Sequence, residues 1–258
     1  MLFWFRRDLR LEDNAGLYAA LNGPFQVLPI FVYDTAILEK LPKKDARLDF
    51  IHTSIAHLQK QLQPLGKSMT TFQGNPLQVI EKLLDTFAVQ KVVTNRDYEP
   101  YARDRDSKIA SFLESKGIEF ETHKDHVLFE KSEVTKDDGL PYKVYTPYSR
   151  KWMAALDNTG IKHFPSENCL ERLLAYDQAL LTLEKIGFSE ASHRAPAYNI
   201  SNDIIDQYEA RRNFPAVAGT SKLGVHLRFG TVSTRKMVEK AKKSNDITFL
   251  KELIWREF

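Results

Sequence analysis

The chain opens with Met1-Leu2-Phe3-Trp4-Phe5 and runs directly into Arg6-Arg7-Asp8-Leu9-Arg10-Leu11-Glu12-Asp13-Asn14. The apolar run is too short for a signal sequence or a membrane span, so it is predicted to be a buried β-strand. The charged loop after it leads to a helix capped near Asp13 or Asn14. In an open α/β sheet the carboxyl ends of the strands form the ligand crevice. The arginines are therefore placed to meet an anion or a neighbouring domain, or to pair with nearby carboxylates.

The same succession of strand and helix is repeated through the first half of the chain. Helical apolar spacing occurs at about 46–65, 76–87 and 103–116. Apolar, β-rich runs lie between these segments, at Leu2 to Phe5, Phe25 to Tyr33, Met69 to Phe72, Lys91 to Asn95 and Glu119 to Thr122. This alternation predicts an α/β fold with a doubly wound, five-stranded parallel sheet. No Gly-x-Gly occurs in the sequence, which argues against a dinucleotide fingerprint.

The pattern changes after the sheet and predicts three regions along the chain. An α/β domain is expected over 1–130, a poorly periodic interdomain linker over 131–201, and the first helices of a second, incomplete helical domain over 202–258. Helices are expected at about 203–213, 220–227, 233–244 and 247–258. The last of these lacks a terminating Gly, Asn or Pro, so the chain is expected to be a fragment.

Composition restricts the class of protein more than its function. The 258 residues are 43% hydrophobic and 28% charged, which is typical of a soluble globular protein. A net charge of +3 is weak, so any nucleic-acid surface must be a local patch. The only cysteine, Cys169, excludes an intrachain disulfide and fits a reducing cytosol, so a cytoplasmic location is expected. No membrane association and no metal site are expected.

A glycine-flanked segment, Gly219-Thr220-Ser221-Lys222-Leu223-Gly224, is a candidate phosphate cradle. Its glycine spacing is that of a Walker loop, but Val225-His226 follows where Lys and Ser or Thr are required. Amides at a helix start, two hydroxyls and an ammonium could still hold a diphosphate. The alternative is a plain helix cap provided by Thr220 or Ser221.

The last predicted helix carries Glu252, Trp255 and Arg256 at positions i, i+3 and i+4. A carboxylate, an indole and a guanidinium then share one helix face. Such a face suits an unstacked nucleobase. The alternative is a partly buried Trp beside an ordinary Arg–Glu pair.

In order and spacing, these stretches resemble the photolyase/cryptochrome family. The segments that carry the resemblance are Trp4-Phe-Arg-Arg-Asp-Leu-Arg10, Tyr142-Lys-Val-Tyr-Thr-Pro-Tyr148, Phe214-Pro-Ala-Val217 with Gly-Thr-Ser-x-Leu, and Glu252-Leu-Ile-Trp-Arg-Glu-Phe258. The match covers the family's α/β antenna domain, its linker and the first helices of its all-helical FAD-binding domain. It implies a deoxyribodipyrimidine photo-lyase, a carbon–carbon lyase that uses reduced FAD and light to repair cyclobutane pyrimidine dimers in DNA.

The resemblance also implies roles for individual residues. Glu252 and Trp255 would contact the flipped lesion, and Arg212 and Arg256 would join them at the DNA surface. FAD would be contacted by Tyr208, Thr220, Ser221, Lys222, Leu223, Gly224 and Phe249. Gly224 stands where Ser is more usual in the family, which removes one hydroxyl from the cradle.

The antenna chromophore and the precise activity stay open. Ala102 stands where folate-binding relatives have Glu, so folate binding is doubtful, and a deazaflavin, another flavin or no antenna are alternatives. A cryptochrome-type blue-light photoreceptor is the rival within the family, although the pair of Glu252 and Trp255 favours dimer repair. A free-standing α/β nucleotide-binding module is the rival outside it. Full-length members of the family are monomers, and the fragment itself is expected neither to retain FAD nor to repair DNA.

Overall fold

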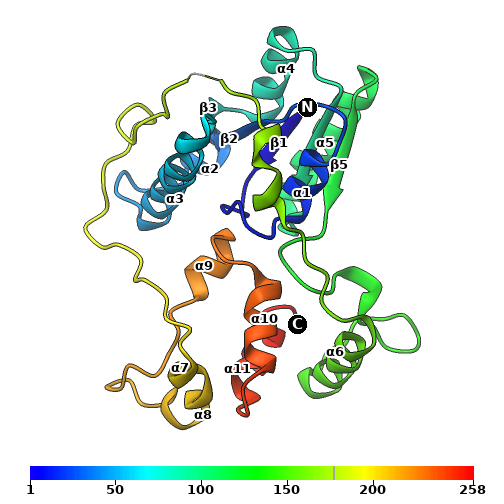
Figure 1. The fold of residues 1–258 in the computed structure, drawn as a ribbon, viewed down its shortest axis with the longest axis vertical. Helices are drawn as coiled ribbons and strands as arrows, with labels where there is room; N and C mark the ends of the chain where they lie inside the picture. The colour runs from blue at the N-terminus through cyan, green and yellow to red at the C-terminus, as the bar shows by residue number, and fades with distance from the viewer. Residues whose placement is uncertain (177) are drawn as a thin grey trace. The chain divides into compact units, whose positions relative to one another are not determined.

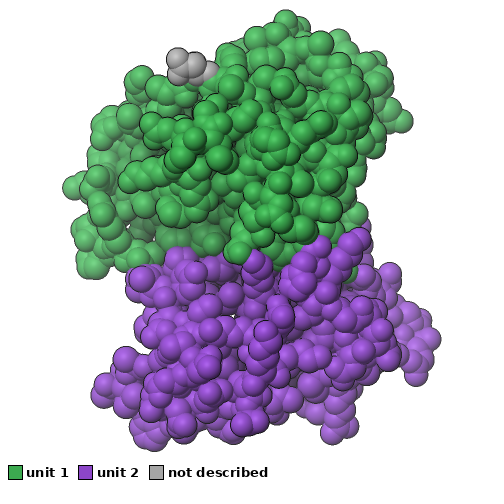
Figure 2. Space-filling model, viewed as in Figure 1, with its two compact units in different colours: residues 1–126, 164–195, 229–231 green, residues 127–163, 196–228, 232–258 purple. Residues whose placement is uncertain are grey.

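The computed structural model describes residues 1–176 and 178–258, which form two compact units (Figures 1 and 2). Unit 1 consists of Met1–His126, Phe164–Ala195 and Phe229–Thr231, and unit 2 consists of Val127–His163, Pro196–Arg228 and Val232–Phe258. The chain passes between the units several times, and residues 131–201 contribute to both of them.

Unit 1 is built on the five-stranded parallel sheet that the sequence predicts, in the order β3-β2-β1-β4-β5. The strands are β1 (Leu2–Phe5), β2 (Leu28–Asp34), β3 (Thr70–Gly74), β4 (Lys91–Asn95) and β5 (Glu119–His123). β2 begins three residues later than predicted because its register pairs Leu28 with Leu2, where β1 begins. Phe25 therefore lies outside the ladder, and 37% of its surface is exposed.

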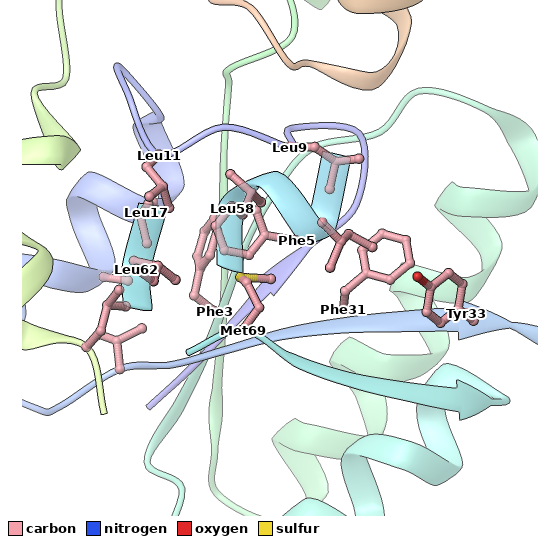
Figure 3. Packing of buried hydrophobic residues seen from close by; sticks show 14 of the residues in the cluster. Phe3, Phe5, Leu9, Leu11, Leu17, Phe31, Tyr33, Leu58, Leu62 and Met69 are labelled. Carbon is pink, nitrogen blue, oxygen red and sulfur yellow. The ribbon is translucent and has the colours of Figure 1, made fainter. Parts of the chain in front are cut away.

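Helices cover both faces of the sheet, as alternate side chains of β1 show. Phe3 and Phe5 pack on one face with Leu17 and Leu58, from two of the helices (Figure 3). Leu2 and Trp4 pack on the opposite face against the two helices that follow β3 and β4. The helices of this unit are α1 (Ala15–Leu21), α2 (Thr35–Leu38), α3 (Ala46–Leu62), α4 (Pro76–Thr86) and α5 (Pro100–Ser115), with short 3₁₀ turns at Gln63–Leu65 and Ser166–Arg172.

Side-chain caps and prolines set where these helices begin. The N-cap carboxylate or amide oxygen accepts a backbone N–H in four of them, from Asn14, Asp34, Asp45 and Asn75. α5 starts at Pro100, three residues before the predicted start, because proline is well accommodated in the first turn of a helix.

Three residues from late in the sequence, Phe229–Thr231, also belong to unit 1. The Leu9 amide donates to the Phe229 carbonyl at 3.1 Å, and the Arg10 guanidinium donates to the Gly230 carbonyl at 3.2 Å. Gly230 has φ +64, and a Cβ built on it would lie 2.2 Å from the Arg7 carbonyl oxygen. The close approach of these two backbones therefore requires glycine at position 230.

Unit 2 is helical, with a core around the fully buried Trp152. Its helices are α6 (Tyr145–Thr159), α7 (Asn202–Asp206), α8 (Tyr208–Arg211), α9 (Gly224–Phe229), α10 (Thr234–Lys242) and α11 (Thr248–Trp255), with a 3₁₀ turn at Lys131–Glu133; α9 ends on the first residue of the segment that belongs to unit 1. In the described part of the chain, no helix is both long and apolar enough to cross a bilayer.

Three predicted helices of this region differ in the structure. The helix expected over 203–213 is two short helices, α7 and α8, separated at Gln207. The helix expected from 220 begins only at Gly224, because Lys222 adopts a left-handed φ of 56° that a right-handed helix cannot contain. The helix expected to reach 258 ends at Trp255, and Arg256 and Glu257 follow as a turn.

Candidate functional site

The candidate site lies in unit 2, along the solvent side of α11. Phe249, Leu250, Leu253 and Ile254 are the buried residues of this helix and hold it against the core. Glu252 and Trp255 lie between and beyond them in sequence and stay accessible, with 40% of the Glu252 side chain and 49% of Trp255 exposed. One face of α11 therefore packs against the core, while Glu252 and Trp255 are accessible to solvent.

Glu252 pairs with an arginine that comes from 40 residues earlier in the chain. The Arg212 guanidinium, which follows α8 directly, donates to the Glu252 carboxylate and forms an ion pair with it. This hydrogen bond raises the pKa of Arg212, so the guanidinium stays charged. The arginine also lies over the Tyr208 ring, 5.6 Å from its centroid. The structure thus brings together Arg212 and Glu252, both of which the family resemblance assigns to a DNA surface.

Trp255 is held by aromatic neighbours. The Tyr145 ring at the start of α6 stacks on the indole, with centroids 3.9 Å apart and planes 7° apart. Phe258 meets Trp255 edge-on at 5.5 Å. The third predicted member of this face, Arg256, instead donates to the Leu227 carbonyl at 3.1 Å. One indole face is therefore covered, and the helix presents Glu252 and Trp255 as the accessible pair.

Tyr208 and Phe249, both predicted to contact FAD, meet directly. Their rings make an edge-to-face contact at 5.2 Å, with Phe249 buried and Tyr208 partly exposed. Burial, with the negative charge of Glu252 as a further cause, raises the pKa of Tyr208, so its hydroxyl remains protonated at neutral pH. The aromatic pair therefore connects α8 with α11 below the Arg212–Glu252 ion pair.

The predicted phosphate cradle is a loop that returns to α8. A Cβ on Gly219 would lie 2.5 Å from the Arg211 Cβ and 2.9 Å from its carbonyl oxygen, so only glycine allows the loop this close to the helix. Ser221 is buried and its hydroxyl lies 3.4 Å from the Leu223 amide, whereas Lys222 and Gly224 are exposed. Because α9 starts only at Gly224, neither Thr220 nor Ser221 directly precedes the helix as a cap residue would.

Two residues of the site, Tyr145 and Glu257, were not predicted from the sequence to have a role there. Tyr145 lies in one of the family-like segments, but nothing in its spacing indicates that it stacks on a residue 110 positions away. Glu257 accepts hydrogen bonds from the Leu128 amide at 2.6 Å and the Trp152 indole N–H at 2.7 Å. Burial raises the pKa of Glu257. The sequence pattern of charges does not indicate that the Glu257 carboxylate holds the turn after α11 in place.

The N-terminal arginines of unit 1 pair internally. Arg6 forms an ion pair with Asp106 at 2.6 Å, and Arg10 forms a buried one with Asp125 at 2.8 Å. Of the two readings that the sequence left open, the structure therefore shows the arginine–carboxylate network. Ala102 is buried in α5, with 3% of its surface exposed. Among the described residues, no cluster of three or more His, Cys, Asp or Glu is arranged to hold a metal ion.

Comparisons with known proteins agree on one family. The DNA photolyase family model matches residues 1–168. A deoxyribodipyrimidine photo-lyase of Synechococcus sp. (strain ATCC 27144 / PCC 6301 / SAUG 1402/1) is 32% identical over the whole chain, which spans 59% of that protein. An uncharacterized 31.6 kDa protein from the atpI 5′ region of Synechococcus sp. (strain PCC 6716) is also 32% identical, and the match covers 98% of its length.

A solved structure extends the match to the fold. An archaeal photolyase from Sulfolobus tokodaii, described with two FAD molecules and a novel light-harvesting cofactor, matches with a TM-score of 0.74 and 26% identity. The match covers the whole of this chain and 57% of that one. The chain therefore spans somewhat less than two thirds of these photolyases.

Proposed function

Because the chain belongs to the DNA photolyase family, we propose that it serves light-driven repair of cyclobutane pyrimidine dimers as a deoxyribodipyrimidine photo-lyase. In this proposal it supplies the lesion-contacting helix and one side of the FAD site. The observation that carries the proposal is the pairing of an accessible carboxylate, Glu252, with an accessible and fixed indole, Trp255, on one packed helix. A carboxylate can accept a hydrogen bond from a base edge while an indole supports its face.

The positive charge of Arg212 would attract the phosphates of DNA to the surface around Glu252 and Trp255. Its ion pair with Glu252 is partly exposed, with 33% of the arginine side chain and 40% of the glutamate side chain accessible, so exchanging partners costs little. When a strand binds, the guanidinium turns to a phosphate and the carboxylate becomes available to the lesion. Photolyases are among the enzymes that flip their target base out of the duplex, and the proposal assigns the same step to DNA bound at this surface.

The loop and the aromatic pair fit one wall of a flavin site. The Ser221 hydroxyl and the Lys222 ammonium are donors suited to a diphosphate, and Tyr208 and Phe249 lie on the adjoining helices. Bound there, reduced FAD would supply light-driven electron transfer to the dimer. The residues of this chain would hold its phosphates and orient the lesion. Lys222 and Gly224 are exposed rather than enclosed, so we expect the 258-residue chain alone to bind FAD weakly and to purify without flavin colour.

The test is binding of a single-stranded thymidine oligonucleotide that carries one cyclobutane dimer, compared with the undamaged strand. We expect tighter binding of the dimer strand, a loss of about tenfold or more in Trp255→Ala, and loss of the dimer preference in Glu252→Gln. Leu140→Ala, which removes an apolar side chain of similar exposure from unit 2, 56% against 49% for Trp255, is the matched control and should change neither affinity. Equal affinity for both strands in the wild-type chain would contradict the proposal.

The remaining alternatives predict different results in the same assay. A cryptochrome-type photoreceptor would acquire FAD without preferring the dimer strand. A free-standing nucleotide-binding module would bind mononucleotides without any need for Trp255. Repair itself is measured as loss of dimers under blue light with an excess of reduced FAD, and any repair activity should be abolished by Trp255→Ala together with Glu252→Gln.

A further inference from the structure

Tyr145 makes two separate contacts with a single turn of α11. Its ring lies flat on the Trp255 indole, with 3.9 Å between centroids. Its hydroxyl donates to the Lys251 carbonyl oxygen at 2.8 Å. Lys251 precedes Trp255 by four residues, so the two lie one above the other along the helix. The first residue of α6 therefore fixes both the backbone turn and the side chain that projects from it.

The hydroxyl contact persists at physiological pH. Burial, with the negative charge of Glu252 nearby, raises the pKa of Tyr145. The phenol therefore keeps the proton that it donates to Lys251. Phe258 adds a second constraint, since its ring lies 5.9 Å from Tyr145 and 5.5 Å from Trp255, roughly perpendicular to both.

Trp255 nevertheless stays half exposed, with 49% of its surface accessible. An indole on an open helix surface would ordinarily move among several rotamers, and ordering such a side chain on binding lowers the affinity. Here stacking by Tyr145 fixes the indole before any ligand arrives. Tyr145 covers one face of the Trp255 indole, and the exposed part of the indole is available for stacking on a base.

We propose that Tyr145 is a positioning residue that holds Trp255 as a preorganised stacking surface for an unpaired base. This inference rests on the proposed function, because it assigns the same site a partner for Trp255. It adds that the affinity of the site for single-stranded DNA depends on a residue that does not itself contact the base. Tyr145 acts only through Trp255, so removing the indole should make Tyr145 irrelevant to binding.

A double-mutant cycle tests this dependence. The probe is the single-stranded thymidine oligonucleotide with and without one dimer, and the variants are Tyr145→Ala, Trp255→Ala and their combination. We expect Tyr145→Ala to weaken binding by about threefold to tenfold, and to have no further effect when Trp255 is already alanine. Tyr145→Phe retains the ring and should stay within about twofold of wild type. Tyr198→Ala is the matched control, because Tyr198 is 40% exposed in the same unit and packs on His226 instead.

A second readout does not depend on DNA. Trp255 is the only one of the three tryptophans that is exposed, since Trp4 and Trp152 are buried, so quenching of fluorescence by acrylamide reports mainly on its indole. Quenching should rise in Tyr145→Ala and stay unchanged in Tyr145→Phe. If the wild-type chain binds no oligonucleotide while quenching follows this pattern, the proposed function fails and the positioning role stands. Unchanged quenching in Tyr145→Ala, or additive losses in the double mutant, would overturn the inference about Tyr145.

Discussion

Replacing Gly230 by alanine should lower the stability of unit 1 far more than the same replacement at an ordinary loop glycine. The φ of +64 costs an alanine about 1 kcal/mol. The new Cβ would also lie 2.2 Å from the Arg7 carbonyl oxygen and 2.6 Å from the Asp8 Cα, so one backbone segment must move. Movement breaks the hydrogen bonds from Leu9 to Phe229 and from Arg10 to Gly230, each worth about 1 kcal/mol. The expected destabilisation is about 3–5 kcal/mol.

Gly66 provides the matched control for this prediction. Its φ of +66 is nearly the same, but a Cβ built there has no heavy atom within 4 Å. Gly66→Ala should therefore lower the free energy of unfolding only by the conformational cost, about 1 kcal/mol. The difference in destabilisation between Gly230→Ala and Gly66→Ala then measures the cost of the steric clash at position 230. The assay is urea unfolding followed by circular dichroism, with hydrogen exchange of the Leu9 amide as a local readout.

The two measurements should agree. In Gly230→Ala the Leu9 amide loses its acceptor and should exchange faster, whereas in Gly66→Ala it should remain protected. Equal destabilisation of the two variants, within about 1 kcal/mol, together with a protected Leu9 amide, would refute the reasoning. That result would mean that segment 229–231 is not held against the loop after β1 in solution.

Two further outcomes are expected in unit 1. Asp45→Asn should destabilise by about 0.5 kcal/mol at neutral pH, because asparagine can still cap α3 but no longer gives the Arg47 guanidinium, which is 63% exposed, a charged partner. The hydrogen bond from the Arg47 side chain lowers the pKa of Asp45 in the folded protein. The stabilisation by the Asp45 carboxylate is therefore fully present above the pKa of the unfolded chain and is lost as the pH falls through the pKa of the folded protein. The free energies of unfolding of wild type and Asp45→Asn, measured in urea, should converge in acid, and a difference that stays constant with pH would contradict this assignment. Methenyltetrahydrofolate should not bind tightly to the α/β unit, because Ala102 offers no carboxylate, and saturable binding at micromolar concentration in a titration would show the contrary.

The sheet could be predicted because its signal is local and redundant. The central strands β1 and β2 are continuous apolar runs, and the helices that follow β1, β2 and β3 have side-chain caps, such as Asn75 before α4. The errors occurred where a distant partner sets the boundary. Phe25 is apolar enough for a strand, yet the register between β1 and β2 begins at Leu2 and Leu28, which composition does not encode.

The candidate site could be predicted only in part, for the same reason. Helical spacing placed Glu252 and Trp255 together on α11, since i and i+3 share a face in any helix. It could not predict that Arg212 pairs with Glu252, because that contact depends on how α8 packs against α11. It also grouped Arg256 with the pair, whereas its guanidinium donates to the Leu227 carbonyl. The left-handed Lys222 is likewise a consequence of the loop path and has no signal in its own residue type.

The turn at the end of α11 explains how such a short helix can carry a rigid surface. Leu253 and Ile254 are buried in the core, and Glu257 fastens the turn through the Leu128 amide and the Trp152 indole. Between these anchors Trp255 has little freedom in its backbone, and Tyr145 removes the freedom of its side chain. Functional groups are most precise when packing fixes both their backbone and their rotamer. On the proposal that Trp255 stacks on an unpaired base, Glu257→Gln should therefore weaken oligonucleotide binding, because it loosens the end of the helix that carries the indole.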